Sequence, residues 1–162
     1  MHAVVRTDKM YGTDNRAGLV SVRYQPDDKM TDIDNGNVVK LEALEDGSRE
    51  VYKGVTPTAS DTLNKIVLID SPEVIYDETK RGMANFYNEA GKISRGYRLH
   101  TGDIFSVTEE ALEGTPAVGN VVELGDSTKL SVVASETGAT VVGKVIDVNT
   151  VGRYTFYVVE VE

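Results

Sequence analysis

The chain has 162 residues, of which 40% are hydrophobic and 27% are charged, a composition typical of globular proteins and not of disordered chains. It contains no cysteine, which excludes disulfides and thiolate metal sites. The longest apolar runs are four residues, as at 66–69, and the N-terminus lacks the apolar core of a secretory signal. We therefore expect a soluble protein without a membrane span or export by such a signal.

The net charge of −9 is distributed unevenly. Residues 1–100 contain 16 acidic and 14 basic residues, whereas residues 101–162 contain ten acidic and three basic residues. Nucleic-acid affinity comes mainly from Lys and Arg that neutralise phosphates, so the distribution disfavours DNA or RNA as a partner. A surface that keeps the protein in solution is the plainest interpretation of its acidity.

Residues 1–36 predict an N-terminal arm of loops around one strand at 19–24, because apolar side chains are few and Asp, Asn and Gly are many. Such an arm becomes ordered on a neighbouring molecule or stays mobile, and the sequence leaves both open. The acidic stretch 26–36 resembles a calcium loop, but its phase is wrong. With Gly36 at the glycine position of the loop, Thr31 and Ile33 stand where carboxylates are needed.

Residues 37–100 predict an irregular β lobe with strands at 38–44, 49–55, 66–69 and 93–99. Asp46-Gly47 indicates a hairpin turn between the first two of these strands, since Asp-Gly supplies the positive φ values that tight hairpins require. Little helix is expected. Met83, Phe86, Tyr87 and Ala90 have helical spacing, but Gly and Asn surround them.

Residues 101–162 predict a C-terminal β-barrel-like lobe, which could form one compact domain with the preceding lobe. Valine accounts for 14 of these 62 residues, and turn residues separate short runs. The expected strands lie at 104–108, 121–124, 129–134, 140–148 and 154–161. A single helical turn is expected at 109–112. The predicted fold class is therefore mainly β, with a small barrel or sandwich in the C-terminal part, a more irregular, hairpin-containing N-terminal part and little helix.

Two strands of this lobe have distinctive patterns. The strand at 154–161 is apolar on both faces, which favours a central strand covered on both sides over one that meets a partner. Gly143 interrupts the strand at 140–148, and an interior glycine often marks a bulge or a barrel corner.

No catalytic residue set can be identified. The only histidines are His2 and His100, and the chain shows no metal-ligand spacing, phosphate-binding loop, nucleophile elbow or dinucleotide fingerprint. A hydrolase that uses paired carboxylates stays open as a minor alternative. Gly96-Tyr97-Arg98-Leu99 and Thr101-Gly102-Asp103 faintly suggest a trimeric nucleotide hydrolase, but the rest of that motif set is missing. We predict a non-enzymatic protein with no catalytic residues, no cofactor and no metal site.

The stretch 79–100 is locally basic and contains three aromatic residues. Arg and Tyr are enriched at protein interfaces, so this stretch is a candidate docking patch for an acidic partner surface. A face balanced by the chain's own acids is the equal alternative. The candidate interface residues are Lys80, Arg81, Phe86, Tyr87, Lys92, Arg95, Tyr97 and Arg98.

Three stretches of the chain have sequences that resemble those of a known group of proteins. They are Ile-Asp-Ser-Pro-Glu-Val-Ile-Tyr-Asp-Glu at 69–78, Asn-Phe-Tyr-Asn-Glu-Ala-Gly-Lys at 85–92, and Arg-Gly-Tyr-Arg-Leu-His-Thr-Gly-Asp-Ile-Phe-Ser-Val-Thr at 95–108. They resemble structural proteins of tailed bacteriophages of Gram-positive hosts, whose gene tends to lie near that of the major capsid protein. The resemblance covers roughly residues 65–162 and carries no catalytic signature.

This resemblance implies a capsid decoration, or cement, protein on the outer surface of the virion, made in the host cytoplasm. The expected partner is the major capsid protein, at junctions between its subunits, and homo-oligomerisation, for example as a trimer, is left open. No nucleic acid and no membrane are expected as partners. The alternative function is a tail, baseplate or host-surface carbohydrate-binding β module.

Overall fold

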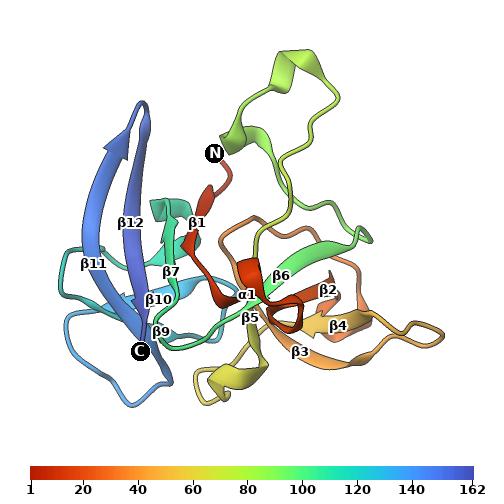
Figure 1. Cartoon of the computed structure of the whole chain (residues 1–162), viewed down its shortest axis with the longest axis horizontal. Coiled ribbons are helices and arrows are strands. Elements are labelled where there is room, and N and C mark those ends of the chain that lie inside the picture. Colours follow the sequence, from red (N-terminus) through yellow and green to blue (C-terminus); the bar gives the residue numbers. More distant parts are fainter.

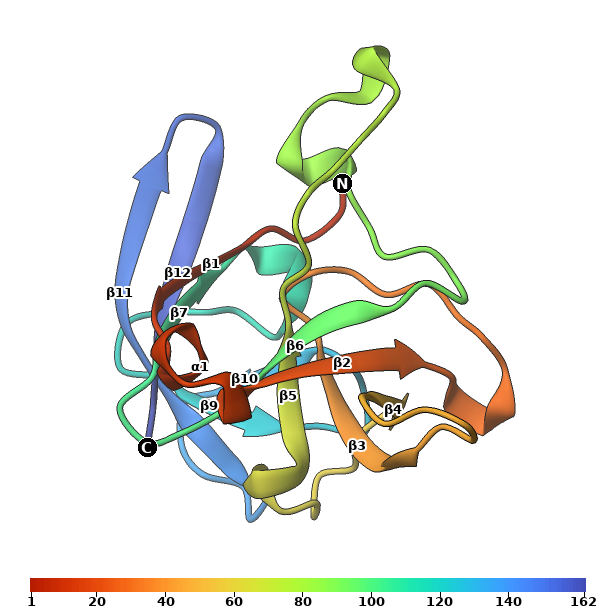
Figure 2. The ribbon, with the colours of Figure 1, turned by 45° about the vertical axis from the view of Figure 1, so that its right-hand side comes forward.

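Twelve strands form a closed five-stranded barrel and a seven-stranded sheet in the computed structural model, which describes residues 1–162 (Figure 1). The mainly β fold class is thereby confirmed. The barrel and the sheet lie side by side, and two segments project from the same end of the molecule (Figures 1 and 2).

The barrel is built from residues 19–98, so the closed barrel lies in the N-terminal half of the chain and not in the C-terminal part. Its strand order is β2-β4-β3-β5-β6, in which β2 and β4 are parallel and every other pair is antiparallel. The strands are β2 (Leu19–Tyr24), β3 (Val38–Leu44), β4 (Val51–Val55), β5 (Ile66–Ile69) and β6 (Ser94–Arg98). The expected hairpin joins β3 to β4, and Gly47 in its turn has φ +76°.

The sheet has the order β1-β7-β12-β11-β9-β10-β8. Its strands are β1 (Val5–Lys9), β7 (Ile104–Val107), β8 (Leu112–Glu113), β9 (Val121–Leu124), β10 (Leu130–Val133), β11 (Val141–Val151) and β12 (Tyr154–Val161). β12 lies between β7 and β11, which confirms that this strand is central. The pairing of β11 with β9 shifts register at Gly143, where a Cβ would lie 1.9 Å from the carbonyl oxygen of Glu160. The expected bulge is confirmed.

Helical structure is limited to short turns. The one α-helix, α1, spans Tyr11–Asp14. The 3-10 turns are η1 (Arg16–Gly18), η2 (Pro26–Asp28), η3 (Leu63–Lys65), η4 (Glu78–Lys80), η5 (Met83–Asn85) and η6 (Glu109–Ala111). None of these helices has the length and apolarity that crossing a bilayer requires.

Residues 1–36 do not form a separate arm. β1 is the edge strand of the sheet and pairs with β7, about a hundred residues further along the chain, while β2 closes the barrel. The polar residues that suggested an arm include Asp32 and Asp34, which accept hydrogen bonds from backbone N–H groups of other segments. Long-range hydrogen bonds of this kind hold the segment in place together with its buried apolar side chains, such as Val5, Val22 and Ile33.

One hydrophobic core joins the barrel to the sheet. In β5, Ile66 and Leu68 face a cluster of 20 buried residues that also contains Phe105 and Val159 of the sheet. The alternate residues, Val67 and Ile69, face a smaller cluster inside the barrel. Since side chains alternate between the two faces of a strand, β5 is an unbroken apolar run because both of its faces are buried.

Two glycines allow the barrel to close tightly. A Cβ at Gly54 would lie 2.6 Å from Cγ2 of Val22, and one at Gly96 would lie 3.0 Å from Cγ2 of Val67. Both valines belong to the cluster inside the barrel. These positions therefore need glycine for space.

Candidate interaction surface

The most prominent surface feature is a loop of residues 72–93, here called the projecting loop, which joins β5 to β6 and contains η4 and η5. It extends away from the barrel at the top of Figure 1, where it is drawn in green. A hollow of about 610 Å³ lies against this loop. Its anchoring and its side chains decide what it can bind.

Buried side-chain amides hold the base of the projecting loop. Asn35 Nδ2 donates to the carbonyl oxygen of Ser71 at 2.9 Å, and the backbone N–H of Ser71 donates to Asn35 Oδ1 at 3.0 Å. From the other end of the loop, Asn88 Nδ2 donates to Asn35 Oδ1 and to the carbonyl oxygen of Ile33, both at 3.0 Å. Asn35 thus connects the two ends of the loop, so its base is fixed.

The N-terminus holds the side of the projecting loop. Asp34 accepts a hydrogen bond from the backbone N–H of Ala3 at 3.0 Å and lies 2.7 Å from Nδ1 of His2. The His2 ring stacks on Tyr87 with 4.7 Å between ring centroids, and the backbone N–H of His2 donates to the carbonyl oxygen of Ala84 at 2.9 Å. The first residues of the chain are therefore packed against the loop.

The tip of the projecting loop forms its own polar contacts. Arg81 Nη2 lies 3.3 Å from Glu78 Oε1, and both side chains are exposed. Asp77 accepts hydrogen bonds from the hydroxyl and the backbone N–H of Thr79, and these bonds hold the pKa of Asp77 below its ordinary value. The loop contains four acidic and three basic residues, so its acids more than balance its positive charge.

The structure brings four of the eight candidate interface residues to the hollow: Lys80, Phe86, Tyr87 and Lys92. Asp77 and Glu89 also line it, so its rim contains both charge signs. The hollow combines aromatic surface with balanced charge.

The other four candidates lie elsewhere. Tyr97 is 6% exposed and belongs to the shared core, Arg98 lies over the ring of Tyr52, and Arg81 pairs with Glu78 at the tip of the loop. Arg95 donates from Nε to the carbonyl oxygen of Asp70 at 2.8 Å, and its Nη2 lies 3.6 Å from the Asp70 carboxylate.

Part of the basic stretch is therefore paired with acidic residues of the same chain. Burial raises the pKa of Asp70 above its ordinary value, although the guanidinium of Arg95 opposes this shift. Arg95 and Arg81 both face acids of the chain itself, as the charge-balanced interpretation expects.

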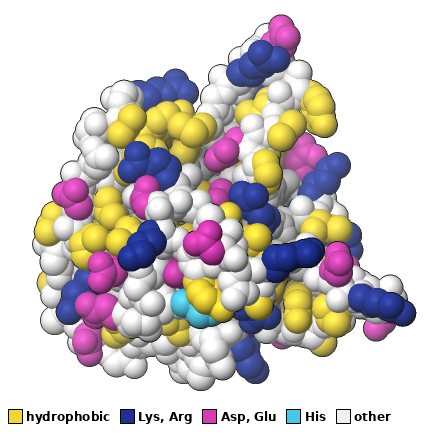
Figure 3. All heavy atoms as spheres, in the orientation of Figure 1, with side chains coloured by type: hydrophobic (Ala, Val, Ile, Leu, Met, Phe, Trp, Pro, Cys, Tyr) yellow, Lys and Arg dark blue, Asp and Glu magenta, His cyan; other side chains and the backbone are white.

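The projecting loop and the β11–β12 hairpin contain seven of the twelve exposed large hydrophobic side chains of the protein. On the loop, Val74 is 59% exposed and Tyr76 is 93% exposed. Figure 3 shows hydrophobic side chains on both projections. Concentrated exposed apolar surface marks interaction sites. Sequence reasoning missed Val74 and Tyr76, although apolar residues in a stretch with no strand pattern were a usable signal.

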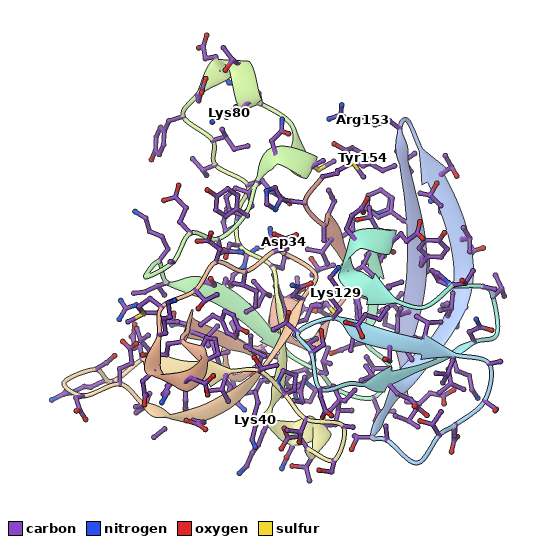
Figure 4. All side chains as sticks on the ribbon, turned by 180° about the vertical axis from the view of Figure 1, so that it is seen from behind. Asp34, Lys40, Lys80, Lys129, Arg153 and Tyr154 are labelled. Carbon is purple, nitrogen blue, oxygen red and sulfur yellow. The ribbon has the colours of Figure 1, made fainter.

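The β11–β12 hairpin is the second projection, and it packs against the first. Tyr154 and Phe156 form a small buried cluster with Val4 and with Ala84 of the projecting loop. Arg153 donates from Nη2 to the hydroxyl of Tyr154 at 3.0 Å. Figure 4 shows Arg153 and Tyr154 at the hairpin tip, at the same end of the molecule as Lys80.

No group of three or more His, Asp or Glu side chains converges in a way that could hold a metal ion. The His100 ring packs at a tilt against that of Tyr11, with 4.1 Å between ring centroids, and the backbone N–H of His100 donates to Asp103 at 2.9 Å. Comparisons with protein-family models, with curated proteins and with solved structures find no match to this chain.

Proposed function

We propose that this chain is a non-enzymatic virion protein that decorates and stabilises the outer surface of a phage capsid. It binds at junctions between major capsid protein subunits, and the projecting loop is its main contact. The observation that carries the proposal is the exposed apolar surface of Val74 and Tyr76 on a loop with a fixed base. The resemblance of residues 65–162 to phage structural proteins supplies the class of partner.

The anchoring of the loop favours binding. Association costs free energy for every flexible segment that becomes ordered, and the contacts of Asn35 and His2 already hold the base of this loop and its residues 84–88. Aromatic side chains at the centre of an interface provide most of its binding energy, and Tyr76, the most exposed of the large hydrophobic residues, fits such a role.

The charge of the protein favours the outer face of the shell. A net charge of −9 repels packaged DNA, which carries a dense negative charge. A stable protein–protein interface buries at least about 1,000 Å² in total, counted over both partners. Many copies on a symmetric lattice compensate through multivalency, so each individual contact can be weak.

The experiment measures binding of the recombinant protein to expanded heads that lack it, with protection of the heads against heat as a second readout. The test variant combines Val74→Ser with Tyr76→Ser. Both side chains are exposed, so the fold should be kept, and removing two apolar contacts should weaken binding by at least about tenfold.

Val118→Ser is the matched control, because Val118 is 61% exposed and lies outside both projections. This control should bind like the wild type. Equal weakening by both variants would show that the projecting loop is not the contact. Recovery of the protein free in lysate and never on purified particles would remove the proposed function altogether.

The hollow supports a second candidate function, a carbohydrate-binding module of the tail or host-surface apparatus. Tyr76, Phe86 and Tyr87 line it together with the amide of Asn85, and its volume of about 610 Å³ lies within the usual range of small-ligand sites. Adsorption to host cell walls that is lost on Phe86→Ala would favour this function, because capsid binding requires no glycan.

A further inference from the structure

One side of the outer half of β11 has no partner strand. β9 pairs with β11 only from Val141 to Lys144, and the backbone of residues 119–120 bonds to Val145. From Asp147 to Val151, β11 pairs with β12 alone. In Figures 1 and 2 no other segment runs along the outer side of this part of β11, and all of its residues from Ile146 onward are exposed.

The geometry of the hairpin fixes which groups point outward. Val151 and Tyr154 face each other across the two-residue turn Gly152-Arg153, and Gly152 has φ +60°. The residues that close such a turn bond to each other, and bonded positions alternate along the strand. The N–H and C=O groups of Val148 and Thr150 therefore point away from β12, which agrees with the donation of the Val148 N–H to the Asp147 carboxylate at 2.9 Å.

The composition of this edge does little to prevent another strand from pairing with it. Protected edge strands carry charged side chains, especially Lys, Pro or β-bulges, and here the register of β11 against β12 shifts at Ile146, where the free edge begins. The stretch 146–151 has neither Lys nor Pro, and four of its six residues are β-branched. Its one charge, Asp147, blocks the outward N–H of Val148. An added strand must draw this carboxylate away.

The charge of Asp147 selects the partner. A Lys or Arg opposite Asp147 would pair with the carboxylate and release the Val148 N–H for a strand bond. A second copy of the chain brings a net charge of −9 to an edge that is already acidic. We infer that the edge at 146–151 binds an extended segment of a different protein as an added β-strand, with a basic side chain opposite Asp147. This inference does not depend on the projecting loop or on the proposed capsid partner.

The test uses two synthetic peptides, Thr-Val-Thr-Lys-Thr-Val-Thr and the same peptide with Glu in the central position, both capped at the ends. They are titrated into the ¹⁵N-labelled full chain, and amide shifts and hydrogen exchange are followed by NMR. The Lys peptide should slow exchange at Val148 and Thr150 and bind at least about fivefold more tightly than the Glu peptide. Added salt should weaken its binding.

Two variants make the test specific. Asp147→Asn should remove the difference between the two peptides, because it removes the charge that distinguishes them. Thr150→Pro removes an outward N–H and should therefore abolish binding of both peptides. The fold should be kept, because proline is tolerated at a strand edge. The inference is overturned if neither peptide protects these amides, or if the two bind the wild-type chain equally. Protection that grows with protein concentration and salt in the absence of peptide would assign the edge to a second copy instead.

Discussion

Asp34 Oδ1 lies 2.7 Å from Nδ1 of His2 and holds the first residues of the chain beside the projecting loop, where the His2 ring stacks on Tyr87. The two residues are 32 positions apart. Through this contact an N-terminus that appears unattached in the sequence becomes part of the support of the candidate interface.

Replacing Asp34 should loosen the loop. Asp34→Ala leaves the backbone N–H of the buried Ala3 without its acceptor, at a cost of about 1–2 kcal/mol in the free energy of unfolding. Trypsin should then cut faster after Lys80 and Arg81. Asp14→Ala, a change at an exposed aspartate of α1, is the control and should leave the cleavage rate unchanged. Equal rates in both variants would mean that the N-terminus does not support the loop.

The base of the loop should be more sensitive than its tip. Asn88→Ala removes both bonds that the Asn88 amide donates within the buried network and should cost about 1–3 kcal/mol, measured by urea unfolding. Asn85→Ala, in the same loop but exposed, should change stability by about 0.5 kcal/mol or less. Similar costs at the two positions would argue against a fixed base.

Acid should weaken the contact between Lys40 and Asp61. Burial of Asp61 opposes its ionisation, but hydrogen bonds from Lys40 and from Thr58 outweigh this and hold its pKa below the ordinary value of 3.8. The stabilisation is therefore present above that ordinary value and is lost as the pH falls through the lower folded-state value.

Urea unfolding at a series of pH values tests this contribution. Between about pH 5 and pH 2 the free energy of unfolding of the wild type should fall more steeply than that of Asp61→Asn, which has no charge to lose. Lys40→Met should also make the fall in the free energy of unfolding less steep than in the wild type, though by less than Asp61→Asn. Parallel curves for the wild type and Asp61→Asn would contradict the role given to this pair.

Closure of the barrel should depend on glycine at position 54. Gly54→Ala places a Cβ 2.6 Å from Cγ2 of Val22 and should cost about 1–3 kcal/mol in thermal or urea unfolding. Adding Val22→Ala should recover part of that loss, because the new methyl group then occupies vacated space. A double variant that loses the sum of both single costs would exclude this steric explanation.

Local patterns in the sequence identify most strands. The predicted bounds of β2, β3, β5, β9 and β12 agree with the structure, because each is an apolar or alternating run that ends at turn residues. β1 was missed, since Thr7, Asp8 and Lys9 have the polar composition of a loop and become a strand only through pairing with β7. β8, with two residues, is too short to leave a pattern.

The position of the barrel and the support of the loop could not be predicted in the same way. Closure depends on the parallel pairing of β2 with β4, which no local spacing indicates. The bond between Asn35 and Asn88 spans 53 residues. The basic stretch was found from composition, but only the fold reveals that Tyr97 is buried while Tyr76 is exposed.

The central claim, that the projecting loop binds the outer surface of a capsid, is tested most directly by a side-chain-resolution reconstruction of particles that carry the protein. Our account predicts density on the outside of the shell at junctions between subunits, with Val74 and Tyr76 buried against capsid protein. A chain that is absent from the outer surface, or one whose projecting loop points into solvent, would contradict it.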